Sequence, residues 1–121
     1  MEVPQIPEKW LLQAGLKNFK PIADHYSFNS KNSKFPVETV QIEDLPFPSR
    51  NAGVIEFEKE RMLPILIGIK NNSALPPIEA HRNPNNNKLE IKNGFHRFYT
   101  SFQLGFKKIP IEISPYFNIH G

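Results

Sequence analysis

The sequence predicts a small α/β domain of the α+β kind, in which a small mixed sheet packs against helices. Segments rich in β-branched residues alternate with segments of helical spacing, and the connections between them are short. Hydrophobic residues make up 39% of the 121-residue chain, which is enough to form one core. We divide the chain into an N-terminal appendage, residues 1–34, and the α/β domain, residues 35–121.

The appendage is expected to contain a short helix and a loop. An apolar cluster around Trp10 follows Pro7 and closes near Gly15 or Asn18, as a short helix does. The polar run 27–33 then predicts a loop. We expect Trp10 to anchor this appendage on the domain.

The first half of the domain begins with a strand near residues 37–42, where β-branched residues are enriched. Two prolines within 45–50 exclude a helix there and predict a stiff, extended loop. Residues 54–70 carry an apolar series too long for one strand, together with good helix formers. They predict a helix that is broken or restarted at Pro64.

The second half predicts a turn and a short strand over 75–81, then an asparagine-rich loop, 82–88, that leads to a partner strand at 89–91. A helix of clear periodicity follows. Its apolar residues lie at i, i+3, i+4 and i+7 and are expected on the core face: Phe95, Phe98, Tyr99 and Phe102. Gly105 is a natural residue for the end of this helix, and 109–113 is an alternating strand.

The composition excludes several classes of protein. The chain has no cysteine, which excludes disulfides, thiolate nucleophiles and cysteine-ligated metals. Its four histidines and its carboxylates do not have the spacing of metal ligands, so we predict no metal site. No segment has the length and apolarity of a membrane span, and the N-terminus does not resemble a signal peptide. We therefore expect a cytoplasmic protein with no membrane partner.

The net charge of +3 is concentrated toward the C-terminus, since residues 81–121 hold six basic and two acidic residues. An excess of this size fits an ordinary solvated surface. It also fits a surface for a phosphate-bearing partner such as DNA. The sequence leaves both interpretations open.

The segment Asn93-Gly94-Phe95-His96-Arg97 holds the candidate site. A helix that begins just after a glycine presents unpaired N–H groups and the positive end of its dipole, and both favour an anion. Arg97 adds a planar fork suited to phosphate, and His96 adds a further donor. We predict a phosphate site made by Asn93, Gly94, His96 and Arg97. For His96 and Arg97, a purely structural role remains the alternative.

A fifth candidate residue is Arg50, which ends the predicted proline loop. A stiff loop is able to aim this side chain at the start of the helix, where it would assist in binding phosphate. A surface position is the alternative.

Residues 92–110 join the Gly-x-His-Arg helix start to a downstream Leu-Gly and an Ile-Pro strand. This combination resembles the signature of the ParB N-terminal/sulfiredoxin superfamily, and the similarity covers about residues 36–113. The resemblance implies a cradle for the phosphates of ATP or CTP, with Mg²⁺ as the accompanying ion. Gly94, His96 and Arg97 match the superfamily's pattern.

Two departures from the superfamily limit what this chain is expected to do. Phe95 stands where the resemblance places the catalytic cysteine of sulfiredoxins, so sulfinic acid reduction is excluded. Too few residues follow the last strand for the DNA-binding and dimerisation modules of partition proteins. We predict nucleotide or phosphate binding, with slow phosphoryl transfer or hydrolysis left open. The alternative is a non-catalytic interaction protein that contacts a protein or DNA through the Trp10 segment and the basic C-terminal third.

Overall fold

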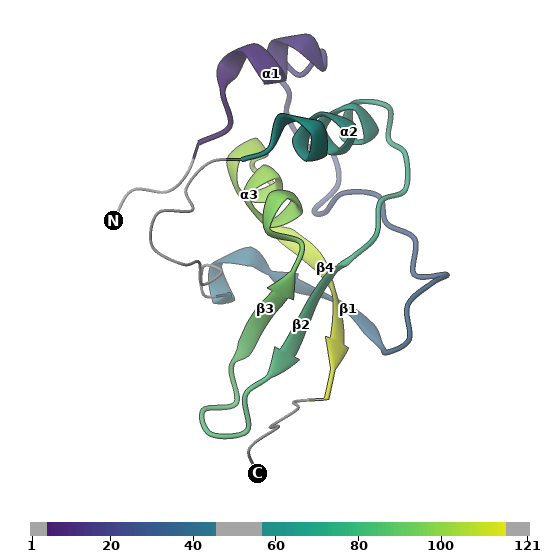
Figure 1. Cartoon of the computed structure of the whole chain (residues 1–121), viewed down its shortest axis with the longest axis vertical. Coiled ribbons are helices and arrows are strands. Elements are labelled where there is room, and N and C mark those ends of the chain that lie inside the picture. The colour runs from purple at the N-terminus through teal and green to yellow at the C-terminus, as the bar shows by residue number, and fades with distance from the viewer. Residues whose placement is uncertain (1–4, 46–56, 116–121) are drawn as a thin grey trace.

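The computed structural model describes residues 5–45 and 57–115. Its helices are α1 (Glu8–Gln13), α2 (Lys59–Lys70) and α3 (Phe95–Leu104), with a short 3₁₀ helix, η1 (Ile42–Asp44), and its strands are β1 (Val37–Gln41), β2 (Ile78–Arg82), β3 (Leu89–Asn93) and β4 (Lys108–Ser114). The sheet and helices confirm the predicted mixed α/β class (Figure 1).

The four strands form one mixed sheet in the order β1-β4-β2-β3. β1 pairs antiparallel with β4, and β2 forms an antiparallel hairpin with β3. β2 and β4 are parallel, with Ile78 opposite Ile111. A parallel pair needs a crossover connection, and α3 is the helix of this crossover because it carries the chain from β3 to β4 (Figure 1).

The core lies where α3 meets the sheet. Figure 1 shows α3 between α2 and the sheet, and it contacts β2 and β4 as well as α2. Ile78, Ile109 and Ile111 from the two central strands are fully buried, as is Phe98 from α3. On the other side of α3, Met62 of α2 is fully buried, and its sulfur lies 3.1 Å from the hydroxyl of Thr100.

The N-terminal segment shares this core. Ile6, Leu16 and Tyr26 are almost completely buried, and the backbone N–H of Ile6 donates to Gln103 Oε1 of α3 at 2.7 Å. Trp10 is only partly buried at the edge of the same cluster, so the deepest anchors are aliphatic residues and a tyrosine. The division of the chain at residue 34 stays a prediction.

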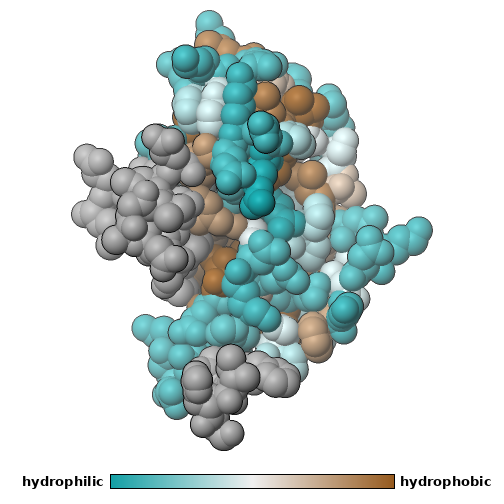
Figure 2. Space-filling view, viewed as in Figure 1, coloured by the Kyte–Doolittle hydropathy of each residue, from teal (hydrophilic) through white to brown (hydrophobic). Residues whose placement is uncertain are grey.

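Three expectations about the helices were wrong. The helix expected over 54–70 begins only at Lys59, because the backbone of Glu58 is extended. α2 continues through Pro64 because this residue lies on an exposed side of the helix, where water can bond the Glu60 carbonyl that loses its N–H partner. Phe102 is 41% exposed, whereas Tyr99 and Thr100 of the same helix are buried and Thr100 contacts Met62 of α2. Figure 2 shows hydrophobic atoms reaching the surface in the upper, helical half of the molecule.

Candidate functional site

The turn between β3 and α3 is built on Gly94. This glycine has a φ of +102°, a left-handed conformation that is strained for other residues. The neighbouring strand also leaves no room for a side chain, because a Cβ built on Gly94 would lie 2.5 Å from Ile78 Cγ2 and 2.7 Å from Ile78 Cβ. The packing of α3 on β2 therefore requires a glycine at position 94.

The first turn of α3 retains the properties predicted for an anion site. No side chain caps this helix start, and its first turn contains no acidic residue. The first intrahelical bond runs from the Phe98 N–H to the Gly94 carbonyl. The positive end of the helix dipole therefore meets no carboxylate within the helix's own first turn.

Arg97 lies half-buried in this first turn and is tied to the loop before β2. Its Nη1 donates to the Pro76 carbonyl at 3.0 Å and to the Pro77 carbonyl at 3.2 Å. Tyr26 shares the Pro76 carbonyl, since its hydroxyl donates to the same oxygen at 2.6 Å. The sequence left a structural role for Arg97 open, and the structure shows one: one end of its guanidinium links α3 to the loop before β2.

His96 joins the start of α3 to the start of α2. Its Nε2 accepts a hydrogen bond from the Glu58 backbone N–H at 3.1 Å, and Glu58 is the residue that precedes the first turn of α2. The ring also packs against Phe57, with the ring centres 5.6 Å apart. An accepting Nε2 requires the proton on Nδ1, so in this structure Nε2 is not available to donate to a phosphate.

Asn93 shapes the turn with its side chain. Its Oδ1 accepts the N–H of Gly94 at 2.9 Å, and its Nδ2 donates to Glu79 Oε2 at 2.8 Å. These bonds hold the last residue of β3 against β2. The structure thus brings Asn93, Gly94, His96 and Arg97 together around one turn, and Arg50 lies outside the described residues. The phosphate-binding role of these residues stays a prediction.

Among residues 5–45 and 57–115, two groups have a clearly shifted pKa. Burial raises the pKa of the Tyr26 hydroxyl far above its usual range, an effect that nearby Arg97 partly offsets. Hydrogen bonds from Asn83 and then from His81 lower the pKa of Glu90, whose two oxygens accept one bond from each at 3.0 and 2.8 Å. Tyr26 therefore stays a neutral donor to Pro76.

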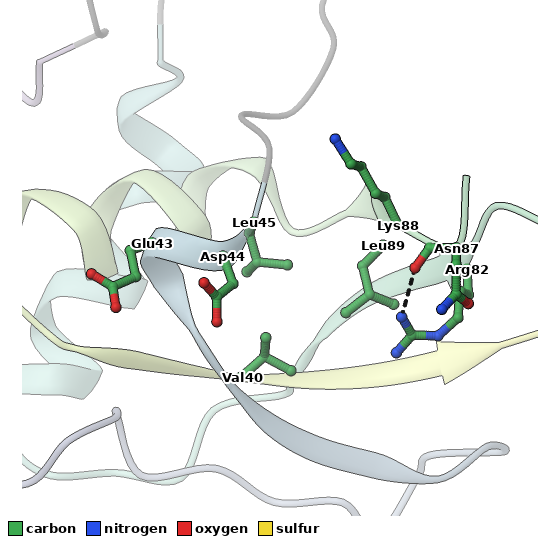
Figure 3. A pocket seen from close by; sticks show the side chains of 8 residues that line it. All are labelled: Val40, Glu43, Asp44, Leu45, Arg82, Asn87, Lys88 and Leu89. Atoms are coloured by element: carbon green, nitrogen blue, oxygen red, sulfur yellow. Dashed lines mark hydrogen bonds between the residues drawn. The ribbon is translucent and has the colours of Figure 1, made fainter.

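A separate cavity of about 390 Å³ lies between η1 and the β2–β3 hairpin (Figure 3). Glu43 and Asp44 lie on one side of it and Lys88 and Arg82 on the other, and Arg82 Nη1 donates to the Asn87 carbonyl at 3.0 Å. Because its two sides carry opposite charges, this cavity does not favour an anion. The start of α3 is the better candidate for a phosphate.

Residues 5–45 and 57–115 contain no group of three or more His, Cys, Asp or Glu side chains placed to hold a metal ion. No helix in this part of the chain has the length and apolarity to cross a membrane.

Comparison with known proteins identifies the fold. No family model matches the chain, and no curated protein matches it. A solved structure does match: the C-terminally truncated chromosome-partitioning protein ParB from Caulobacter crescentus, complexed with CTP-γ-S, with a TM-score of 0.52 and 20% sequence identity. The match covers 69% of this chain and 47% of that one, so the chain corresponds to about half of the ParB structure. The ParB-like fold expected from residues 92–110 is confirmed.

Proposed function

We propose that this protein binds a nucleotide through its phosphates at the start of α3. The observation that carries the proposal is an uncapped helix start with Arg97 in its first turn, set directly after the left-handed Gly94. Helix starts of this kind bind phosphate with backbone N–H groups and the helix dipole. The ParB structure of the same fold is a complex with the nucleotide analogue CTP-γ-S, which supports a nucleotide as the ligand.

Arg97 is the side chain that we assign to the phosphate. Only its Nη1 takes part in the bonds to the loop before β2, and among the described residues its Nε and Nη2 have no hydrogen-bond partner. An arginine held at one end presents its remaining donors in a fixed direction, which reduces the entropy lost on binding. The bonds to the Pro76 and Pro77 carbonyls thus leave Nε and Nη2 of Arg97 for the proposed phosphate.

The other predicted residues receive supporting roles in this proposal. His96 positions the start of α2 through the Glu58 N–H, and Asn93 holds the turn that Gly94 allows. Mg²⁺ would enter with the nucleotide, bound to its phosphates. The proposal is for binding, and it assigns no chemical step to the bound nucleotide.

Titration calorimetry with CTP and with ATP, each with and without Mg²⁺, tests the proposal. Arg97→Ala should weaken binding by about 1–3 kcal/mol, or about 5- to 150-fold, the range for a charge-assisted hydrogen bond. Arg82→Ala is the matched control, because Arg82 also donates from Nη1 to a backbone carbonyl but does so at the other end of β2. This variant should bind as the wild type does.

Since Arg97 also supports the loop before β2, the melting temperature of each variant must be measured alongside its affinity. Arg97→Lys keeps the positive charge and should bind with intermediate affinity. The proposal fails if the wild type binds neither nucleotide with Mg²⁺ present, or if Arg97→Ala and Arg82→Ala bind equally well. A folded protein that binds no nucleotide would leave the interaction-protein alternative.

A further inference from the structure

A second cavity, of about 470 Å³, lies between the N-terminal segment 19–27 and the C-terminal end of α2. This volume is within the range of pockets that bind small molecules. None of the residues predicted to bind phosphate lines it. Its contents are therefore a separate question from the nucleotide site.

The floor of this cavity is apolar and well supported. Ile69 and Phe106 line it with side chains that are 8% and 6% exposed, so they belong to the packed core. Phe19 packs against Phe106 with the ring centres 6.0 Å apart. A floor that is already packed binds an apolar side chain without first rearranging.

The charge around the cavity is positive. Lys20 and Lys70 line it, and Asp24, although it belongs to the same segment, does not. The aliphatic carbons of the Lys70 side chain lie against Gly15. A Cβ built on that glycine would be 3.4 Å from Lys70 Cε. The ammonium group of Lys70 is thus carried on a supported stem, and the cavity favours a ligand with negative charge.

The end of α2 does not cancel this preference. The carbonyls of Ile67, Ile69 and Gly68, in its last turn, accept hydrogen bonds from the N–H groups of Asn71, Asn72 and Ser73, respectively. These bonds satisfy acceptors that would otherwise repel an anion at a helix C-terminus.

The exposure of Ile22 favours a peptide over a small molecule as the ligand of this cavity. It lines the cavity, yet its relative exposure is 104%, so its side chain projects into solvent. A small molecule that fills the cavity would leave Ile22 in water. A peptide that crosses the rim would cover it and gain the free energy of that apolar burial.

We propose that this cavity binds an acidic peptide segment of a protein partner. A bulky apolar side chain of the peptide fills the cavity over Phe19, Ile69 and Phe106. Carboxylates on either side of it pair with Lys20 and Lys70, and the peptide covers Ile22. The N-terminal segment therefore forms half of an interaction surface in addition to packing on the core.

The test measures fluorescence anisotropy of the full chain with a labelled, capped peptide of sequence Asp-Glu-Phe-Leu-Glu-Asp. Lys20→Glu combined with Lys70→Glu should weaken binding at least about tenfold, because it places like charges opposite each other. Lys88→Glu combined with Lys92→Glu changes the net charge equally on the β2–β3 hairpin and should leave binding within about twofold of the wild type. Ile22→Ser should weaken binding about tenfold, and it cannot disturb the core because Ile22 is fully exposed.

Three outcomes would overturn the proposal. Equal losses of peptide affinity in the two double lysine variants would mean that the peptide binds the basic protein without a defined site. Equal binding of a peptide with alanine in place of Phe-Leu would mean that the apolar floor is not used. Complete displacement of the peptide by hexanoate at the same concentration would show that a small carboxylic acid, rather than a peptide, is the ligand.

Discussion

Replacing Gly94 with alanine tests the geometry on which the candidate site rests. The new Cβ would lie 2.5 Å from Ile78 Cγ2, 2.7 Å from Ile78 Cβ and 3.1 Å from Ile78 Cα, whereas carbon atoms pack at about 3.5–4.0 Å. A rotation of the Ile78 side chain removes only the first of these contacts. The start of α3 must therefore move away from β2.

The expected cost has two parts. The left-handed conformation of Gly94, with φ +102°, costs an alanine about 1–2 kcal/mol. Overpacking against a strand in the core adds about 1–3 kcal/mol. We expect Gly94→Ala to lower the free energy of unfolding by about 2–5 kcal/mol, a large part of the stability of a small domain.

Gly105→Ala separates the two parts of this cost. Gly105 has a similar φ of +92°, but a Cβ there would meet only Pro21, at 3.9 Å or more. Gly105→Ala should lower the free energy of unfolding by about 1–2 kcal/mol, from the backbone conformation alone. Urea denaturation of both variants measures the difference, and equal losses would refute the steric argument. Ile78→Ala should not rescue Gly94→Ala, because the Ile78 Cβ remains in place.

Three further predictions test individual contacts by urea denaturation. Tyr26→Phe should cost only about 1 kcal/mol, because the Pro76 carbonyl keeps a second donor, and a loss above about 3 kcal/mol would contradict this reasoning. Glu90 has a lowered pKa in the folded state, so the stability it contributes is present above its ordinary value of 4.5 and is lost as the pH falls through the lowered value. Glu90→Gln should therefore be less stable than the wild type near neutral pH and equal to it in acid, and a constant difference at every pH would contradict the assignment. Leu16→Ala should lower the free energy of unfolding by about 2–4 kcal/mol and Leu12→Ala by less than about 1 kcal/mol, because Leu16 is 3% exposed and Leu12 is 48% exposed. Similar losses in the two variants would mean that the N-terminal segment is not packed as described.

The elements of the fold were largely predictable because their signals are local. The spacing of aromatic residues in 95–102, together with Gly105 as the helix end, predicts α3, and the alternation in 109–113 predicts β4, each within a residue of the observed bounds. The helix-starting role of Gly94 was predictable for the same reason. The break predicted at Pro64 was wrong because the effect of a proline on a helix depends on whether its side of the helix is exposed. Local sequence does not report this exposure.

The partners of the site residues could not be predicted from local patterns. His96 meets a backbone N–H that is 38 residues away, and Arg97 meets carbonyls 20 and 21 residues away. The pattern Gly-x-His-Arg specifies residue types that suit an anion, but it does not say which of their atoms the fold itself employs. The sequence alone therefore leaves open how many donors of the two side chains are available to a ligand.

The sequence by itself determined the α/β class, the order of the elements, and the helix start that suits an anion, because periodicity, turn residues and composition act over a few neighbouring positions. Only the tertiary structure decided that Gly94 is needed for the approach of α3 to β2, and that Arg97 is held at one end by the loop before β2. It alone assembled the cavity between the N-terminal segment and α2. The physical reason is that these features arise between segments far apart in the chain, whose contacts are set by how whole elements pack.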